Sequence, residues 1–207
     1  SYPQGAFADE VLFKSGLHYF RQQDYPNAFV RFDRLINEFP GSERVAMATF
    51  YQGEIFTSRN QYDLAFDKYQ SALNDFEDKG LIWLRIAQVN FHLGKYDEAI
   101  RNLSNVPDTK TFLFEKETIK GNALYAKKDY LDALRSFETA AQSANNDIAY
   151  EDAIVRQART LYQLKEYRET LALYRRLLEI NPKDQYLLMA GAVAFTANDY
   201  RSAIGFY

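Results

Sequence analysis

The chain has no cysteine among its 207 residues. This absence excludes disulfides, thiolate metal sites and cysteine nucleophiles, but it does not reveal which redox compartment the protein occupies. Histidine is nearly as scarce, since His18 and His92 are the only two. Neither has a second potential ligand three or four residues further on, which is the spacing that a helical metal site uses. The sequence therefore predicts no metal site, and we interpret both histidines as structural or surface residues.

Sequence signatures of catalysis are also missing. There is no glycine-rich phosphate loop, no nucleophile elbow and no calcium-binding loop. The carboxylate pairs Glu115/Glu117 and Glu151/Asp152 lie at the starts of predicted helices, where the helix dipole stabilises negative charge without any catalytic role. We therefore predict no catalytic residue, no cofactor and no enzymatic activity.

Long apolar runs and an excess of basic residues are absent too. The most apolar stretch, residues 186–197, is far shorter than the roughly 20 residues that span a bilayer, and it predicts a buried helix rather than a transmembrane segment. The net charge is −3 and the two signs are interspersed, which disfavours nucleic acid as a partner because its capture needs a clustered basic face. A hydrophobic content of 47% excludes a disordered chain.

The sequence contains a repeat instead. Six times a tyrosine is followed three residues later by a small residue and, in most copies, four residues after that by an aromatic one. Successive tyrosines are 37, 34, 34, 37 and 33 residues apart, and a period in this range predicts stacked helical units rather than one globular core. The copies are Tyr25/Ala28/Phe32, Tyr62/Ala65/Tyr69, Tyr96/Ala99/Leu103, Tyr130/Ala133/Phe137, Tyr167/Thr170/Tyr174 and Tyr200/Ala203/Tyr207.

A small residue also stands nine positions before each of these tyrosines, where it lets two helices approach closely. These residues are Gly16, Gly53, Ala87, Gly121, Ala158 and Gly191. Apolar residues follow helical spacing on both sides of a polar two-residue turn, so each unit is predicted to be a helix A, a turn and an antiparallel helix B. We expect the turn residues to end helix A and cap helix B. The predicted pairs are 9–22/25–38, 46–59/62–76, 80–93/96–105, 113–127/130–143, 149–164/167–179 and 184–197/200–207.

This pattern, with Pro40 and Pro182 fifteen residues after their tyrosines, resembles the tetratricopeptide repeat. The resemblance implies an all-α fold, a right-handed superhelix (α-solenoid) of about six antiparallel helix–turn–helix units with the last one truncated. We expect an N-terminal linker at residues 1–8 and a single solenoid at 9–207, with repeats at about 9–45, 46–79, 80–112, 113–148, 149–183 and 184–207. Because the sequence stops midway through the last helix B, we expect a longer natural chain or pairing of the last unit with another molecule.

One irregularity predicts a local change in the array. Pro107 comes four residues earlier in register than Pro40 or Pro182, so helix B of the third repeat should be short. We expect a bend at residues 106–109, with Asp108 or Thr109 capping the following helix.

The resemblance also implies which residues meet a partner. In this family the A helices line the concave side of the superhelix, and positions 2, 5, 9, 12 and 13 of each unit face the groove. The partner-binding residues expected in the first three units are Phe13, Leu17, Phe20, Phe50, Glu54, Leu84, Gln88 and Phe91. Those expected in the last three are Asn122, Tyr125, Arg159, Tyr162, Leu188 and Phe195. The same positions also include Glu10, Arg21, Met47, Thr57, Ser58, Leu81, His92, Glu115, Thr118, Ala126, Asp152, Val155, Gln163, Gln185, Ala192 and Thr196.

Position 12 is aromatic in five of the six units: Phe20, Phe91, Tyr125, Tyr162 and Phe195. One interpretation is that this row of aromatic rings is a binding surface, because such side chains supply large contact area at low rotamer cost. The alternative is that the rings pack between neighbouring A helices and expose only an edge. Both interpretations stay open, since a register error of one residue exchanges a groove position for a core position.

A known subfamily provides a further comparison. Co-chaperones of this family grip an acidic chaperone tail with a clamp of lysine, arginine and asparagine. Phe13, Leu17 and Tyr51 stand where three of the clamp residues would be, and only Arg85 fits the pattern. The clamp is absent, so a chaperone tail is not an expected ligand.

These features predict a non-catalytic scaffold or adaptor that binds an extended or helical segment of a partner protein. Two alternatives are a homo-oligomer that assembles through the C-terminal repeat and a regulatory domain of a larger chain. The first two units, with the Phe-Pro-Gly-Ser connection at residues 39–42, are similar to repeats of bacterial cell-envelope proteins. This similarity implies an adaptor in the assembly of a multiprotein complex, periplasmic or membrane-associated, with a cytoplasmic location as the alternative.

Overall fold

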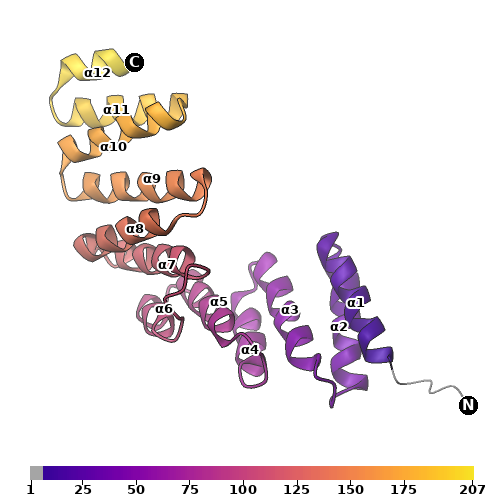
Figure 1. The fold of residues 1–207 in the computed structure, drawn as a ribbon. Helices are drawn as coiled ribbons and strands as arrows, with labels where there is room; N and C mark the ends of the chain where they lie inside the picture. The colour runs from indigo at the N-terminus through magenta and orange to yellow at the C-terminus, as the bar shows by residue number, and fades with distance from the viewer. Residues whose placement is uncertain (1–6) are drawn as a thin grey trace, which may run out of the picture. The chain divides into compact units, whose positions relative to one another are not determined.

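The computed structural model describes residues 7–207, which form twelve α-helices and no β-strand within that range (Figure 1). Helices that follow one another in each hairpin pack together, and the predicted all-α fold of helix–turn–helix units is confirmed. The helices are α1 (Ala8–Arg21), α2 (Tyr25–Glu38), α3 (Val45–Ser58), α4 (Tyr62–Ala72), α5 (Lys79–His92), α6 (Tyr96–Leu103), α7 (Leu113–Ala126), α8 (Tyr130–Ser143), α9 (Asp147–Gln163), α10 (Tyr167–Ile180), α11 (Asp184–Thr196) and α12 (Tyr200–Phe206).

The described helices divide into two compact units between Val106 and Pro107. The first unit holds α1 to α6, and the second holds α7 to α12. Helix α6 has only eight residues, which confirms the short helix predicted from Pro107. It ends in a tight turn, where the amides of Ser104 and Val106 donate to carbonyls three residues earlier. The predicted bend at residues 106–109 stays a prediction.

Each hairpin turn has the same backbone form. Its first residue adopts a positive φ, between 57° and 74°, at Gln23, Asn60, Gly94, Lys128, Lys165 and Asn198. The amide of the next residue then donates to the carbonyl five residues back, as from Asp24 to Tyr19 at 2.9 Å. This bond satisfies a carbonyl that the end of helix A leaves unpaired, as in a Schellman motif. The predicted capping of helix B is confirmed only at Asp24 and Asp199, whose side chains accept an amide of the following turn.

Within a hairpin, the small residue of helix A lies against the aromatic ring of helix B. A Cβ added to Gly16, Gly53 or Gly121 would lie 2.5–2.6 Å from the nearest ring carbon of Phe32, Tyr69 or Phe137. The close approach predicted from the spacing of small residues is therefore present, and the rings occupy the space that a larger side chain would need.

Each unit has its own buried core. In the first unit, Phe32, Leu35 and Ile55 form the centre of one cluster. A second cluster surrounds Tyr69 and Ile82, with the partly buried Trp83 packed against it. In the second unit, the main cluster joins α9, α10 and α11 through residues that include Ile154, Leu177 and Ala190.

The structure shifts several predicted helix ends. Helix α4 stops at Ala72 instead of residue 76, because Phe76 turns inward and packs 4.8 Å from the Phe50 ring. The ammonium group of Lys79 donates to the carbonyls of Leu73 and Asn74, which have left the helix. Of the predicted linker at residues 1–8, residues 1–6 lie outside the described residues, and α1 begins at Ala8.

The predicted cap after Pro107 is wrong. Helix α7 begins at Leu113, and Phe112 at its N-cap makes no capping bond through its side chain. The carbonyl of Thr109 accepts the amides of Phe112 and Leu113, while the Asp108 carboxylate pairs with Lys116 at 2.7 Å. A backbone turn therefore takes the place of the expected side-chain cap.

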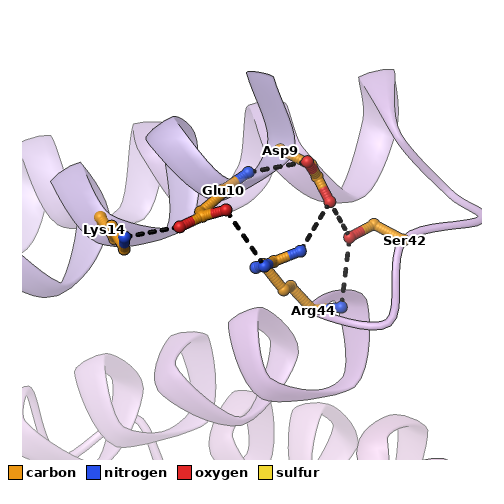
Figure 2. A network of polar contacts seen from close by, with 5 residues as sticks. All are labelled: Asp9, Glu10, Lys14, Ser42 and Arg44. Carbon is orange, nitrogen blue, oxygen red and sulfur yellow. Dashed lines mark hydrogen bonds and ion pairs between the residues drawn. The ribbon is translucent and has the colours of Figure 1, made fainter. Parts of the chain in front are cut away.

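The longer connection after α2 is tied to the start of α1. Figure 2 shows the Ser42 hydroxyl donating to Asp9 at 2.5 Å and the Arg44 guanidinium bridging Asp9 and Glu10. Glu10 also pairs with Lys14 along the same helix. The Ser42 bond is the main reason that the pKa of the Asp9 carboxyl is lowered. The connection after α2 is thus held to the start of α1 by polar contacts within the first repeat.

The connection that contains Pro182 is held in the same way. The Glu151 carboxylate, near the start of α9, accepts hydrogen bonds from Asn181, Lys183 and Tyr186. These bonds, with that of Lys183 the strongest, lower the pKa of Glu151 to about 2. An acidic residue near the start of a helix A therefore anchors the connections that contain Pro40 and Pro182.

Candidate functional site

An apolar pocket of about 430 Å³ lies in the second unit, between residues of α7, α9, α10 and α11. Four of its lining residues belong to the predicted partner-binding set: Tyr125, Arg159, Tyr162 and Leu188. Three more, Gln163, Gln185 and Ala192, stand at the expected groove positions. The structure brings these predicted residues together in one pocket.

Helical spacing explains how these side chains meet. On α9, Arg159, Tyr162 and Gln163 stand three and four residues apart, so they share one face of the helix. On α11, Leu188 and Ala192 follow the same rule. The tyrosine ring and the aliphatic side chains make the surface mainly apolar, and none of the lining residues is acidic.

Sequence reasoning missed Tyr174, Met189 and Val193, which complete the pocket. Tyr174 belongs to the aromatic series that packs under the small residue of helix A, so its pattern indicates only a core role. The one signal in the sequence is the hydroxyl group of Tyr174, because Phe32 and Phe137 occupy the equivalent position in their repeats and have no hydroxyl. A polar atom at the tip of a core ring needs a partner near the surface of the core.

The Tyr174 hydroxyl has an unusually weak acceptor. The side chain is only 3% exposed, and its hydroxyl donates to the Met189 sulfur at 3.4 Å. Burial raises the pKa of this hydroxyl, while the positive charge of Arg159 acts in the opposite direction. Arg159 and Tyr174 both line the pocket.

Two arginines on α9 differ sharply in their partners. Arg156 binds Asp152 through two hydrogen bonds of 2.8 and 3.0 Å and reaches the Asn122 side chain on α7 at 2.7 Å. Asn122, a predicted groove residue, thus links two A helices. Arg159 is exposed, and among residues 7–207 it makes no hydrogen bond or ion pair.

The aromatic residues at position 12 share one packing arrangement. Each ring lies 5.3–5.7 Å from the ring of the tyrosine that begins helix B of its own repeat. The pairs are Phe20–Tyr25, Phe91–Tyr96, Tyr125–Tyr130, Tyr162–Tyr167 and Phe195–Tyr200. Packing therefore occurs within a repeat, and Tyr162 and Phe195 still leave 37% and 59% of their surface exposed.

The predicted residues of α1 join an aromatic cluster in the first unit. The Tyr51 ring lies 5.1 Å from Phe20 and 6.2 Å from Phe13, and it stacks on Phe32. Phe13, Phe20 and the neighbouring Leu17 pack against the buried core there and are only half-buried themselves. Beside this cluster the first unit has a pocket of its own, of about 680 Å³, whose lining residues include Phe50, Tyr51 and Phe76.

Two predicted groove residues are buried instead of exposed. Leu84 is 0% exposed, so it has no surface to offer a partner and is removed from the predicted set. Phe50 is 6% exposed and lines the pocket beside Tyr51 in the first unit. Phe50 packs between Phe76 and Tyr69, with ring centroids 4.8 and 5.6 Å away. The inward fold of Phe76 gives Phe50 a neighbour that helical periodicity did not predict.

The other predicted residues of the first unit are half-buried. Glu54 accepts hydrogen bonds from the Tyr69 hydroxyl at 2.5 Å and from Arg85 at 3.2 Å, while Gln88 and Phe91 lie further along α5. Arg85, the one residue that fits the chaperone-tail clamp, therefore already binds a carboxylate of this chain. The structure thus gives a second reason to exclude that clamp.

Metal sites and membrane spans both need features that residues 7–207 lack. In that range no three histidine, aspartate or glutamate side chains come together in a way that would hold a metal ion. None of the helices described there is long and apolar enough to cross a membrane.

Solved structures with the same fold come from several bacteria. PilF of Pseudomonas aeruginosa is 18% identical, with a TM-score of 0.73, and the match covers 96% of this chain and 88% of PilF. A tetratricopeptide repeat protein of Parabacteroides merdae is 15% identical, with a TM-score of 0.78 and coverage of 96% and 77%. MamA of Desulfovibrio magneticus is 10% identical, with a TM-score of 0.73 and coverage of 83% and 94%. The comparison with curated protein sequences gave no match.

Family models agree with these structural matches. A model for single tetratricopeptide repeats matches residues 152–184. The model of the tetratricopeptide repeat-like domain matches residues 8–165, which is well over half of the sequence. The chain therefore belongs to the tetratricopeptide repeat-like family.

Proposed function

We propose that this protein is a non-catalytic scaffold that binds a segment of a partner protein in the pocket of its second unit. Membership of a repeat family whose members present extended binding surfaces supports the general role. The single observation that carries the specific proposal is the apolar pocket on α7, α9, α10 and α11.

The pocket has the properties of an anchor site for a peptide. Its volume of about 430 Å³ lies within the range usual for ligand sites, and exposed apolar side chains border it. Leu188 is 59% exposed and Tyr162 is 37% exposed, so both are free to lose surface to a partner. A helix or an extended segment that inserts a few apolar side chains binds such a groove with a typical Kd of about 1 μM, or about −8 kcal/mol.

The test compares two charge substitutions on exposed leucines of the same unit. Leu188→Glu places a carboxylate at the pocket, whereas Leu131→Glu places one on α8, where the residue is 65% exposed and does not line the pocket. Both variants should keep the helicity and the thermal transition of the original protein, because neither side chain is buried. Circular dichroism checks this requirement before binding is measured.

Affinity capture from extracts of the source cell, read by mass spectrometry, then measures binding. We expect a partner that is retained by the original protein and by Leu131→Glu but lost by Leu188→Glu. A partner that is bound equally by all three proteins would place the interaction elsewhere and reject the pocket as its site.

A second candidate function is self-assembly through the last repeat. The feature that favours it is an exposed apolar face on α12 and the residue after it, where Ile204 is 78% exposed and Tyr207 is 71% exposed. Sedimentation velocity over a range of concentrations tests this candidate. A mass that rises with concentration and stays monomeric in Ile204→Glu would support it, and a constant mass would reject it.

We also propose a location at the bacterial cell envelope, in the assembly of a multiprotein complex. Its support is the resemblance of the first two repeats, with the connection at residues 39–42, to envelope proteins. Fractionation of source cells into periplasm, membrane and cytoplasm tests this location directly, and recovery only in the cytoplasm would reject it.

A further inference from the structure

We infer that the pocket of the second unit binds a peptide segment in which an aspartate or glutamate side chain lies between apolar ones, with the carboxylate received by Arg159. This inference rests on the proposed function and specifies the chemistry of the partner. It follows from the hydrogen-bond donors of Arg159 and Tyr174 and from the absence of an acidic residue among those that line the pocket.

The first observation concerns charge. Arg159 carries the only formal charge among the residues that line the pocket, and it is exposed and without a hydrogen-bonded or ion-paired partner among residues 7–207. Arg156, one turn earlier on the same helix, has its guanidinium occupied by Asp152 and Asn122. A guanidinium presents several donors in a fixed plane that matches a carboxylate, so an acidic group is its natural partner.

The second observation concerns a buried hydroxyl. Tyr174 lines the same pocket and is 97% covered by the protein, yet its hydroxyl donates only to the thioether sulfur of Met189. A thioether is a weak acceptor, and a buried donor without a good acceptor is energetically costly. A carboxylate oxygen that enters beside Arg159 supplies a much stronger acceptor to this hydroxyl as well.

The third observation explains why apolar side chains should flank the acidic residue of the peptide. Leu188, Met189 and Val193 line the pocket on α11, and Tyr162 borders it on α9. Apolar side chains on both sides of the acidic residue would cover these groups and exclude water from the ion pair. Exclusion of water strengthens the pair relative to one at an open surface.

The first experiment selects phage-displayed random dodecapeptides on the whole protein. We expect the selected peptides to share an acidic residue flanked by apolar ones and to lose binding to Leu188→Glu. Selection on Arg159→Gln should keep the apolar positions and lose the acidic one. Arg168→Gln removes the same charge from the same repeat, away from the pocket, and should keep both.

The second experiment measures the coupling between the peptide acid and Arg159. Two synthetic copies of the most enriched peptide, differing only by glutamine in place of the acid, are titrated by fluorescence anisotropy. On the original protein the glutamine peptide should bind about fivefold to tenfold more weakly. On Arg159→Gln the two peptides should bind equally, and Tyr174→Phe should reduce the difference without removing it.

The outcomes separate this inference from the proposed function. Peptides that are apolar but carry no acid overturn the inference and leave the proposed function intact. An acid preference that persists in Arg159→Gln also overturns the inference, because the carboxylate then binds elsewhere. Peptides that bind Leu188→Glu as well, or no enrichment at all, overturn both.

Discussion

At the scale of single residues, the contact between a glycine and an aromatic ring holds the two helices of a repeat together. The fit is not equally rigid in every copy. Gly121 faces Phe137, which is 2% exposed, whereas Gly191 faces Tyr207, which is 71% exposed. A buried ring has nowhere to move when a methyl group is added, but an exposed ring can turn away.

We therefore expect Gly121→Ala to destabilise the protein and Gly191→Ala to leave it unchanged or more stable. The added Cβ would lie 2.5 Å from a Phe137 ring carbon, and such overpacking costs about 1–3 kcal/mol. Alanine recovers up to about 1 kcal/mol of helix propensity in both variants. Urea unfolding followed by circular dichroism measures the two changes. Equal losses in both variants would contradict the role of ring mobility.

The Glu151 network makes a prediction about pH. Because the pKa of Glu151 falls from 4.5 to about 2 in the folded protein, the folded state binds this proton more weakly than the unfolded chain does. The stabilisation of the folded state by ionised Glu151 is therefore complete above about pH 5, and it is lost as the pH falls toward about 2. Glu151→Gln should be less stable than the original protein at neutral pH, and the difference should shrink across that range. Urea titrations at several pH values test this, and a difference that does not change with pH would contradict it.

At the scale of elements, the six hairpin turns share a backbone form that their sequences satisfy unequally. Only Gly94 suits a positive φ without steric cost, while Lys128 and Lys165 adopt φ values of 66° and 64°. Both lysine side chains are exposed. The left-handed conformation is therefore imposed by the close packing of helices A and B and not by the local sequence.

Glycine should consequently be the better residue at these turns. Lys128→Gly and Lys165→Gly are each expected to stabilise the protein by about 0.5–1 kcal/mol, whereas Gly94→Ala is expected to cost about 1 kcal/mol. The urea midpoint of each variant is the measurement. A loss of stability in both lysine variants would show that those side chains contribute more than the turn geometry costs.

Periodicity predicted the helices closely because it records which faces are buried. Every helix was predicted, and the position of each turn follows from its tyrosine. The ends that were missed depend on contacts distant in sequence, such as the Phe76–Phe50 packing that stops α4. The cap of α7 was missed because a backbone carbonyl, which carries no residue-specific signal, took the place of a side chain.

At the scale of the whole molecule, stability should be distributed along the chain and not concentrated in one centre. Repeat proteins gain stability from each unit and from contacts with its nearest neighbours. The helices of each unit contact mainly those next to them in sequence, as expected for such an array. A substitution that destabilises one repeat should therefore destabilise only that repeat and its nearest neighbours.

Hydrogen exchange measures that distance. In Gly121→Ala we expect faster amide exchange in α7, α8 and the adjacent α9, with α1 and α2 unchanged. Mass spectrometry of peptic fragments resolves these helices. Faster exchange throughout residues 7–207 would indicate a single cooperative unit.

The candidate site was only partly predictable. The positions that face the groove in this family identified four residues of the pocket, because groove residues recur at fixed places on the A helices. These residues are Tyr125, Arg159, Tyr162 and Leu188. The family positions failed at Leu84, which is fully buried in the first unit. They also gave no reason to choose between the pocket of the second unit and the pocket beside Tyr51 in the first unit, since the lining of each arises from packing in three dimensions.

The partly buried Trp83 has a consequence for spectroscopy. It is the only tryptophan in the sequence, and it packs against the second core cluster of the first unit. Indole emission therefore reports the environment of the first unit alone, whereas the far-ultraviolet circular dichroism signal sums the helices of both. Recording the two signals in one denaturant titration distinguishes concerted unfolding of the two units from sequential unfolding, without any label or substitution.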